Sequence, residues 1–253
     1  FYSRLGKANE KIDSSTKKLY QCVYYHKLGN SEESDSLIFT RENNPEMYFN
    51  LLTTSDERFL ILIENNSKTK KMNVYFDDFN DKINGLGILI KDFEKSIKFI
   101  DNIDNKIIAL TDYTADNNML VSIDPAFPLK WTPIINNMKD ALLLNAQIAG
   151  EKIVTIFQSS ANQHLIVFDF NGNVTYNINV GTAMNIGAFM GRKGDNELLL
   201  SVESYTKPPI FTIFDLSKND FTLKINYNLY NKFNYDNYIT ENQYYKSLDG
   251  TEI

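Results

Sequence analysis

Short apolar segments separated by turn residues recur along the whole chain. In LIVFDF, residues 165–170, Leu165 and Val167 point to one side of an extended chain. Ile166, Phe168 and Phe170 point to the other side, so both faces are apolar. Such segments are rich in Ile, Val, Phe and Tyr, which suit a pleated surface. They predict β-strands that are buried on both faces, unlike the strands of a simple sandwich, which alternate between apolar and polar positions.

The gaps between these segments are short, mostly four to ten residues. A parallel α/β sheet would also give strands with two apolar faces, but it requires a covering helix between successive strands. Short gaps favour antiparallel hairpins instead. A small antiparallel sheet with two buried faces has to lie between other sheets of its own kind, and this is the arrangement of blades in a β-propeller.

An aspartate after an apolar strand recurs at a nearly constant interval. Asp78, Asp124, Asp169 and Asp215 are separated by steps of 46, 45 and 46 residues. A period of this length is typical of four strands per propeller blade. We expect each aspartate to end the third strand of a blade and to bond the backbone of the following turn. This role is structural, because catalytic aspartates would not recur once per blade.

The repeat sets the expected domain organisation. We expect an all-β fold in which residues 1–228 form a partial β-propeller and residues 229–253 form an exit segment. The blades are expected at 1–40 (incomplete, with three strands), 46–92, 96–137, 140–180 and 183–228. Residues 89–100 and 137–150 have helical spacing of apolar residues. The repeat nevertheless predicts a strand, a turn and a strand in each.

Charge excludes some classes of function. The formal net charge is −6 and the pI is near 5.1, which argues against nucleic acid and anionic membrane surfaces as partners. No apolar run reaches the ~18–20 residues that span a bilayer. Cys22 is the single cysteine, which fits a reducing compartment and hence the cytoplasm. The periplasm stays open, because the chain begins at Phe1 and a signal peptide would lie outside it.

Few residues suggest chemistry. His26 and His164 are expected in third strands, as side chains that fill or edge a blade rather than as metal ligands. No Gly-x-Ser-x-Gly sequence is present, so no catalytic residue, metal site or cofactor is predicted. The acidic stretch at 31–35 is expected to be an exposed turn. Trp131 is expected to pack between blades.

Four stretches resemble the propeller domain of the prolyl oligopeptidase (prolyl endopeptidase) family of serine peptidases. Residues 19–39 resemble the family's third and fourth strands with the acidic turn between them, and 44–65 resemble the next blade with its hairpin, here Ser-Asp-Glu-Arg-Phe at 55–59. Residues 203–221 resemble the last blade, and 237–253 resemble the segment that re-enters the hydrolase domain. The order and spacing of these stretches carry the resemblance through the whole chain.

The resemblance implies a function for a longer protein. It implies a seven-bladed propeller, about five blades of which are present, inserted into an α/β-hydrolase domain. The family cuts short proline-containing peptides after proline with a Ser-Asp-His triad that lies outside this chain, while the propeller limits which peptides enter. The family's pocket-facing methionine aligns with Met47 or Tyr48. Residues 64–68, in the next loop, depart from the family's pattern.

Two other functions stay open. The chain could be a non-catalytic propeller that serves as an interaction scaffold, or the propeller of a sister peptidase in the same superfamily. In either case an incomplete ring leaves open sheet edges, and unpaired edge strands recruit partners. We therefore expect self-association, in addition to a covalently linked hydrolase domain.

Overall fold

The computed structural model describes residues 1–5, 20–42, 44–81, 85–160, 162–178, 180–181, 184–225, 237–241 and 243–251. The strands of these residues form five antiparallel sheets, four with four strands and one with three. The all-β propeller prediction is confirmed, with about five blades present. The described ranges contain no α-helix. They also contain no helical segment that is long and apolar enough to cross a membrane.

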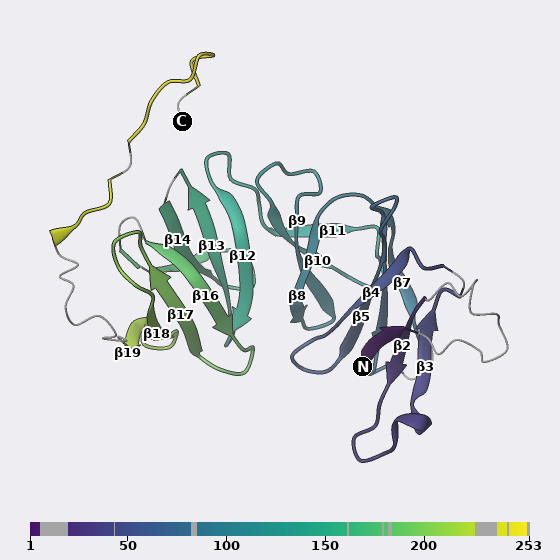
Figure 1. The fold of residues 1–253 in the computed structure, drawn as a ribbon. Coiled ribbons are helices and arrows are strands. Elements are labelled where there is room, and N and C mark those ends of the chain that lie inside the picture. Colours follow the sequence, from purple (N-terminus) through teal and green to yellow (C-terminus); the bar gives the residue numbers. More distant parts are fainter. Residues whose placement is uncertain are drawn as a thin grey trace. The chain divides into compact units, whose positions relative to one another are not determined.

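The strands follow one another along each sheet in chain order (Figure 1). The three-stranded sheet contains β1 (Tyr2–Leu5), β2 (Gln21–Tyr25) and β3 (Ser36–Thr40). The four-stranded sheets contain β4 (Met47–Thr53), β5 (Phe59–Asn66), β6 (Met72–Asp78) and β7 (Gly87–Phe93); β8 (Ile97–Ile103), β9 (Lys106–Thr111), β10 (Met119–Ile123) and β11 (Trp131–Ile135); β12 (Leu142–Ala149), β13 (Lys152–Ser159), β14 (Asn162–Phe168) and β15 (Val174–Ile178); and β16 (Asn185–Gly191), β17 (Glu197–Glu203), β18 (Ile210–Asp215) and β19 (Asp220–Ile225).

The two segments with helical spacing are extended, as the repeat predicts. Residues 89–100 contain the end of β7 and the beginning of β8, and residues 137–150 contain an isolated bridge between Met138 and Ala141 followed by β12. The local helical spacing is therefore overruled by tertiary context, because β7, β8 and β12 each pair with a neighbouring strand at the edge of a four-stranded sheet.

The chain forms two compact units, one of residues 1–107 with 123–131 and one of residues 108–122 with 132–253. In the first unit, Val23 of β2 packs with Phe49, Leu62 and Tyr75 of the next sheet. In the second unit, one apolar cluster joins the sheet β12–β15 to the sheet β16–β19. Its buried members are Ala149, Val154, Ile156, Leu165, Val167, Ile178, Ile186, Phe189, Leu198, Leu200, Val202, Phe214 and Leu216.

Burial of the central strands follows the predicted two-sided pattern. Leu165, Val167 and Phe168 of β14 are all at most 2% exposed, although they point to both faces. Glutamines add a polar link between neighbouring sheets. Gln21 Oε1 accepts the N–H of Phe49 at 2.9 Å in the first unit, and Gln163 Oε1 accepts the N–H of Ile186 at 2.7 Å in the second. Both glutamines thus satisfy a backbone donor in the first strand of the following blade.

The four recurring aspartates have the predicted turn role. In each case one Oδ1 atom accepts the N–H two residues later, from Asn80, Ala126, Asn171 and Ser217. Asp169 also accepts the N–H and the side-chain amide of Asn173. These Asx-type bonds close the turn that follows each third strand.

Candidate functional site

Met47 and Tyr48 begin β4 and point to opposite faces of its sheet. Met47 packs against the apolar cluster of Val23, Phe49, Leu62 and Tyr75. Tyr48 is 42% exposed. Their partners in β5 are Asn66 and Asn65. The structure therefore gives Met47 a partly packed position and leaves the Tyr48 side chain accessible.

A buried carboxylate lies one residue further along the ladder, where Glu64 pairs with Phe49. The Glu64 side chain is 1% exposed. Arg41, which follows β3 of the preceding sheet, donates from Nε to Glu64 Oε1 at 2.5 Å and from Nη2 to the Tyr75 hydroxyl at 2.7 Å. The Tyr75 hydroxyl and the Asn73 amide donate to Glu64 Oε2 at 2.9 and 2.8 Å. The carboxylate is thus fully compensated, and it connects two sheets.

The protonation states follow from these contacts. Burial acts most strongly on Glu64 and raises its pKa, but the hydrogen bonds from Arg41, Asn73 and Tyr75 together lower the pKa below its ordinary value. Burial and the hydrogen bond to Glu64 raise the pKa of Tyr75. Glu64 is therefore ionised and Tyr75 neutral around pH 7. Such a neutralised pair stabilises geometry but is unsuited to proton transfer at that pH.

The segment at 64–68 differs from the predicted loop. Glu64 to Asn66 belong to β5, and the turn begins only after them. Asn66 Oδ1 accepts the N–H groups of Lys68 and Thr69, and this bonding fixes the turn. The change from the family pattern is therefore accommodated inside a paired strand, because Glu64 has Arg41 as a partner.

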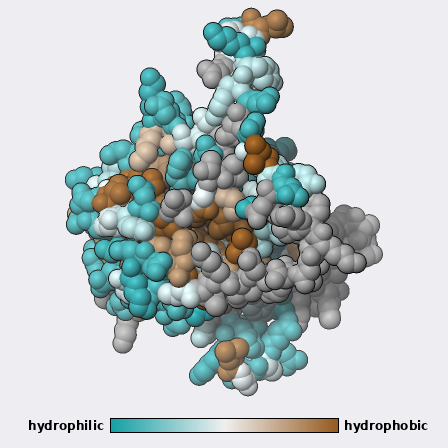
Figure 2. All heavy atoms as spheres, turned by 90° about the vertical axis from the view of Figure 1, so that its left-hand side faces the viewer, coloured by the Kyte–Doolittle hydropathy of each residue, from teal (hydrophilic) through white to brown (hydrophobic). Residues whose placement is uncertain are grey.

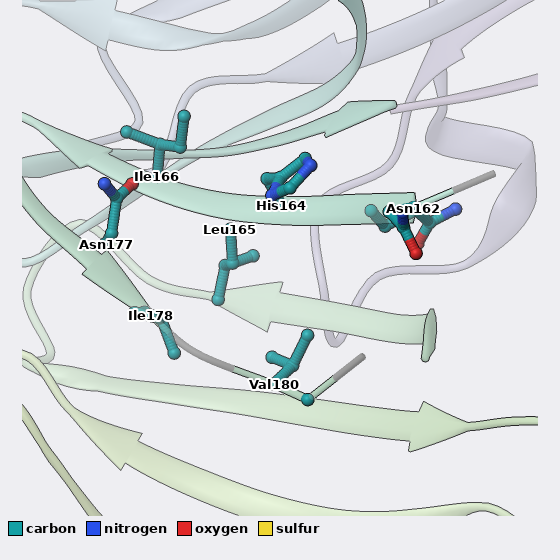
Figure 3. A pocket seen from close by; sticks show the side chains of 9 residues that line it. Asn162, His164, Leu165, Ile166, Asn177, Ile178 and Val180 are labelled. Atoms are coloured by element: carbon teal, nitrogen blue, oxygen red, sulfur yellow. The ribbon is translucent and has the colours of Figure 1, made fainter. Parts of the chain in front are cut away.

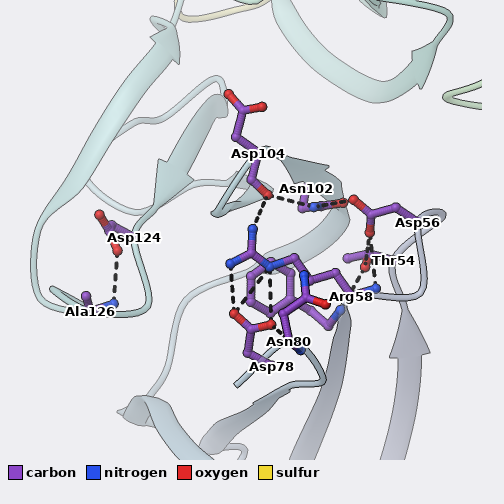
Figure 4. Close-up of polar contacts among 10 residues, drawn as sticks. Thr54, Asp56, Arg58, Asp78, Asn80, Asn102, Asp104, Asp124 and Ala126 are labelled. Carbon is purple, nitrogen blue, oxygen red and sulfur yellow. Dashed lines mark hydrogen bonds and ion pairs between the residues drawn. The ribbon is translucent and has the colours of Figure 1, made fainter. Parts of the chain in front are cut away.

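The opposite end of the same sheet carries the hairpin of residues 55–59, Ser-Asp-Glu-Arg-Phe (Figure 4). Arg58 donates from Nε and Nη2 to the Asp78 carboxylate and from Nη1 to the Asp104 carbonyl at 3.2 Å. Asp56 Oδ2 accepts the amide of Asn102 at 2.7 Å. The hairpin thus ties its own sheet to the residues at the end of β8 within the first unit.

A second contact strengthens this connection. The N–H and hydroxyl of Ser55 donate to the carboxylate of Asp101, which is 4% exposed. A cavity of about 360 Å³ lies beside the hairpin and is lined by Arg58, Phe76, Asp78, Asp81, Gly85, Gly87, Asn105, Asp124, Pro125 and Ala126. Its charged groups include the ion pair of Arg58 with Asp78, which lowers the pKa of Asp78.

The acidic stretch at 31–35 is only partly the exposed turn that the sequence predicts. Glu32 and Glu33 are exposed, but the Asp35 side chain is 2% exposed. The Tyr2 hydroxyl donates to Asp35 Oδ2 at 2.6 Å, and His26 Nδ1 lies 2.7 Å from Asp35 Oδ1. The hydrogen bond from Tyr2 contributes most to the lowered pKa of Asp35. The prediction fails at Asp35 because long-range partners bury it.

His26, His164 and Trp131 lie in or directly beside strands of the sheets. His26 directly follows β2, and His164 lies exposed in β14, the third strand of its sheet. No cluster of three or more metal-ligating side chains was found among the described residues. The Trp131 ring lies 5.6 Å from that of Phe93, which ends the preceding sheet. The expected packing of Trp131 between blades is confirmed.

Comparison with known proteins identifies the family. The family model described as "Prolyl oligopeptidase, N-terminal beta-propeller domain" matches residues 1–225. The prolyl endopeptidase of Elizabethkingia miricola is 28% identical over 255 residues, which cover the whole chain and 35% of that protein. Prolyl oligopeptidase ophP of Omphalotus olearius is 22% identical with the same coverage.

Solved structures agree on the fold. A chain from a structural study of two prolyl endopeptidases superimposes with a TM-score of 0.80 at 20% identity, over 99% of this chain and 36% of that one. Prolyl oligopeptidase B from Galerina marginata without ligand gives 0.79 at 18% identity, over 92% and 34%. The chain spans about a third of the length of these relatives. Its repeated four-stranded sheets and the match over residues 1–225 show that it belongs to the family of N-terminal β-propeller domains of prolyl oligopeptidases.

Proposed function

We propose that this chain is the gating propeller of a serine peptidase that hydrolyses peptide bonds after proline in short peptides. The observation that carries the proposal is the family match over residues 1–225. The catalytic triad would be supplied by a covalently linked α/β-hydrolase domain. Residues 229–253 would be the exit segment that leads into that domain.

The polar clusters of the first unit suit this passive role. Arg58 with Asp78, and Arg41 with Glu64, are compensated ion pairs that connect strands or sheets. A filter has to keep its opening constant, and cross-sheet bonds of this kind resist the separation of blades. Binding and exclusion of peptides, rather than bond cleavage, would be the propeller's contribution.

We propose further that Met47 and Tyr48 face the peptide. Tyr48 has an accessible ring and an uncharged cross-strand partner, Asn65, which suits an uncharged peptide. In the full-length enzyme, Tyr48→Ala is expected to raise KM severalfold and to leave kcat nearly unchanged, because a uniform binding contact is lost. Tyr205→Ala, at an 89% exposed tyrosine, is the control. Equal KM values for the two variants would contradict the proposal.

The function is tested with the full-length protein that contains this chain. It is expected to release the reporter amine from a blocked Gly-Pro amide, and a serine-directed phosphonylating inhibitor is expected to stop this turnover. The 253-residue chain alone is expected to be inactive. Lack of turnover by the full-length protein would favour a non-catalytic scaffold. Preference for a reporter with a basic or free N-terminal residue would favour a sister peptidase.

We place the protein in the cytoplasm. Cys22 is 4% exposed and forms no disulfide, and its Sγ lies 3.3 Å from the Thr40 hydroxyl, an arrangement that suits a reducing compartment. Fractionation of the source cells with an antibody against this chain tests the proposal. Recovery of the protein with periplasmic markers would overturn it.

We also propose that the 253-residue chain self-associates through its terminal sheets. The outer face of β16–β19 exposes Met190 and Leu199, which pair across the two strands, and Leu199 also pairs with Ile213. Figure 2 shows hydrophobic residues gathered on this side of the molecule. An exposed apolar sheet face of this kind marks an interaction surface, and a second copy of the chain is the partner we propose.

A further inference from the structure

A cavity of about 460 Å³ lies against the beginning of β14 and the end of β15 (Figure 3). Its lining residues are Asn162, Gln163, His164, Leu165, Ile166, Asn177, Ile178, Val180 and Gly181. Five of them are consecutive in β14. Because consecutive side chains of a strand point to opposite faces, a cavity that touches all five lies along the edge of the strand, not on one face of the sheet.

The strand register explains this open edge. β13 pairs with every residue of β14 from Asn162 to Phe168. β15 pairs with β14 only from Leu165 onward and ends at Ile178, the partner of Leu165. In the sheet β4–β7, by contrast, the outer strand β7 pairs with β6 all the way to Met72, which is the first residue of β6. The first three residues of β14 therefore have an inner partner strand but no outer one in β15.

The direction of the main-chain groups follows from two contacts. The Ile166 carbonyl accepts the hydroxyl of Thr155 in β13, so the main-chain groups of Ile166 face β13. The N–H of Asp169 donates to the Asn173 carbonyl on the other side. Main-chain groups alternate along a strand, so the N–H and C=O of Gln163 face the open edge. They are placed to bond an added strand.

The side chains around the edge define what fits. Leu165 and Ile178 are buried and Val180 is partly buried, so they provide an apolar wall. Asn162 Oδ1 is shielded from solvent and has no hydrogen-bond donor. A shielded acceptor without a donor is unfavourable, and an N–H from a ligand would satisfy it. None of the nine lining residues is an acid, lysine or arginine, so the cavity suits an uncharged main chain with a small apolar side chain.

We propose that this edge is a binding site for an extended peptide, which adds to β14 as an outer strand. The peptide main chain bonds the N–H and C=O of Gln163, and one of its N–H groups donates to Asn162 Oδ1. A valine-sized side chain lies against Leu165, Ile178 and Val180. This is strand addition to an exposed sheet edge, and it requires no catalytic domain.

The probe is the heptapeptide Lys-Thr-Val-Thr-Val-Thr-Lys amide with an N-terminal fluorescein, titrated with the 253-residue chain by fluorescence polarisation. Saturable binding is expected at concentrations below about 1 mM. The same peptide with N-methyl groups at alternate residues, made in both registers, is the matched control. At least one of the two N-methylated peptides is expected to bind about tenfold more weakly than the unmodified peptide, or not at all, because N-methylation removes main-chain donors.

Three protein variants localise the effect. Val180→Lys and Asn162→Leu are expected to weaken binding about tenfold, the first by introducing a charge at the apolar wall and the second by removing the acceptor. Thr175→Lys, on β15 away from the cavity, is expected to bind like the wild type. Circular dichroism checks that each variant is folded. The proposal would be overturned if both N-methylated peptides bound as tightly as the unmodified peptide, if the wild type showed no saturable binding, or if Thr175→Lys lost as much binding as the other two variants.

Discussion

At the scale of single residues, the buried Glu64 is the most consequential charge in the first unit. Its partner Arg41 is 43% exposed, whereas Glu64 itself is almost fully shielded. Arg41→Met would leave the carboxylate with only the neutral donors Asn73 and Tyr75. Removal of one member of a buried pair typically costs about 3–5 kcal/mol. We expect a loss near the lower end at pH 8, because Arg41 is partly solvated and two donors remain.

The loss should depend on pH in a defined direction. In the wild type the pKa of Glu64 is lowered, so its stabilising contribution is complete above the unfolded value of about 4.3 and is lost as pH falls through the folded pKa. In Arg41→Met burial dominates and the folded pKa of Glu64 rises above the unfolded value. The variant then recovers stability as pH falls from 8 to 5, whereas the wild type does not.

Urea unfolding at pH 5 and pH 8 measures both effects. Lys68→Met, at a 75% exposed lysine, is the control for removal of a surface cation and should match the wild type at both pH values. If Arg41→Met were equally destabilised at pH 5 and pH 8, the carboxylate would not be the source of the loss.

At the scale of elements, the turn between β14 and β15 depends on Gly172. Its φ is +85°, and a Cβ atom there would lie 2.0 Å from the carbonyl oxygen of Ile134 in β11. Gly29 has a similar φ of +91°, but nothing lies within 4 Å of its Cβ position. Gly29→Ala should therefore cost only the left-handed backbone term, about 1–2 kcal/mol.

Gly172→Ala should cost about 1–3 kcal/mol more than Gly29→Ala, because main-chain atoms have to move. Thermal unfolding of the two variants compares backbone strain alone with strain plus a clash. A difference close to zero would show that the chain around Ile134 shifts freely, and would contradict the close packing of this turn against β11.

The recurring aspartates should differ in their contribution to the turns. Asp169 accepts three hydrogen bonds from Asn171 and Asn173, whereas Asp124 accepts one from Ala126. Asp169→Ala is therefore expected to lower Tm more than Asp124→Ala, and Asp169→Asn should recover part of the loss because it retains an acceptor oxygen. Differential scanning calorimetry measures the order; an equal decrease in Tm for both alanine variants would contradict it.

At the scale of the whole molecule, the fold was predictable because the same physical signal is repeated. Two apolar faces per strand and an aspartate at the end of each third strand occur in successive blades, so an ambiguous segment such as 89–100 is assigned by its position in the repeat. The polar clusters were less predictable. Glu64 follows the apolar run 59–63, and its burial was not predicted. Its partner Arg41 lies 23 residues away, and only the packing of two sheets brings them together.

Self-association is the prediction that belongs to the molecule as a whole. Met190 of β16 is 61% exposed, and its cross-strand partner Leu199 of β17 is 36% exposed. Both lie on the outer face of the sheet β16–β19. Unpaired sheets of this kind bind other chains. Met190→Lys would place a charge in that face, and the cost of burying an unpaired charge should prevent association.

The measurement is light scattering of the 253-residue chain from about 1 to 200 µM, a range that brackets micromolar dissociation constants. The wild type is expected to increase in mass with concentration, and Met190→Lys to remain a monomer. Val174→Lys is the matched control, because Val174 is 57% exposed but lies on β15, outside the terminal sheets. A wild type that stays monomeric over the whole range would contradict the prediction. Association lost equally in Val174→Lys would show instead that net charge, and not the face of β16–β19, controls it.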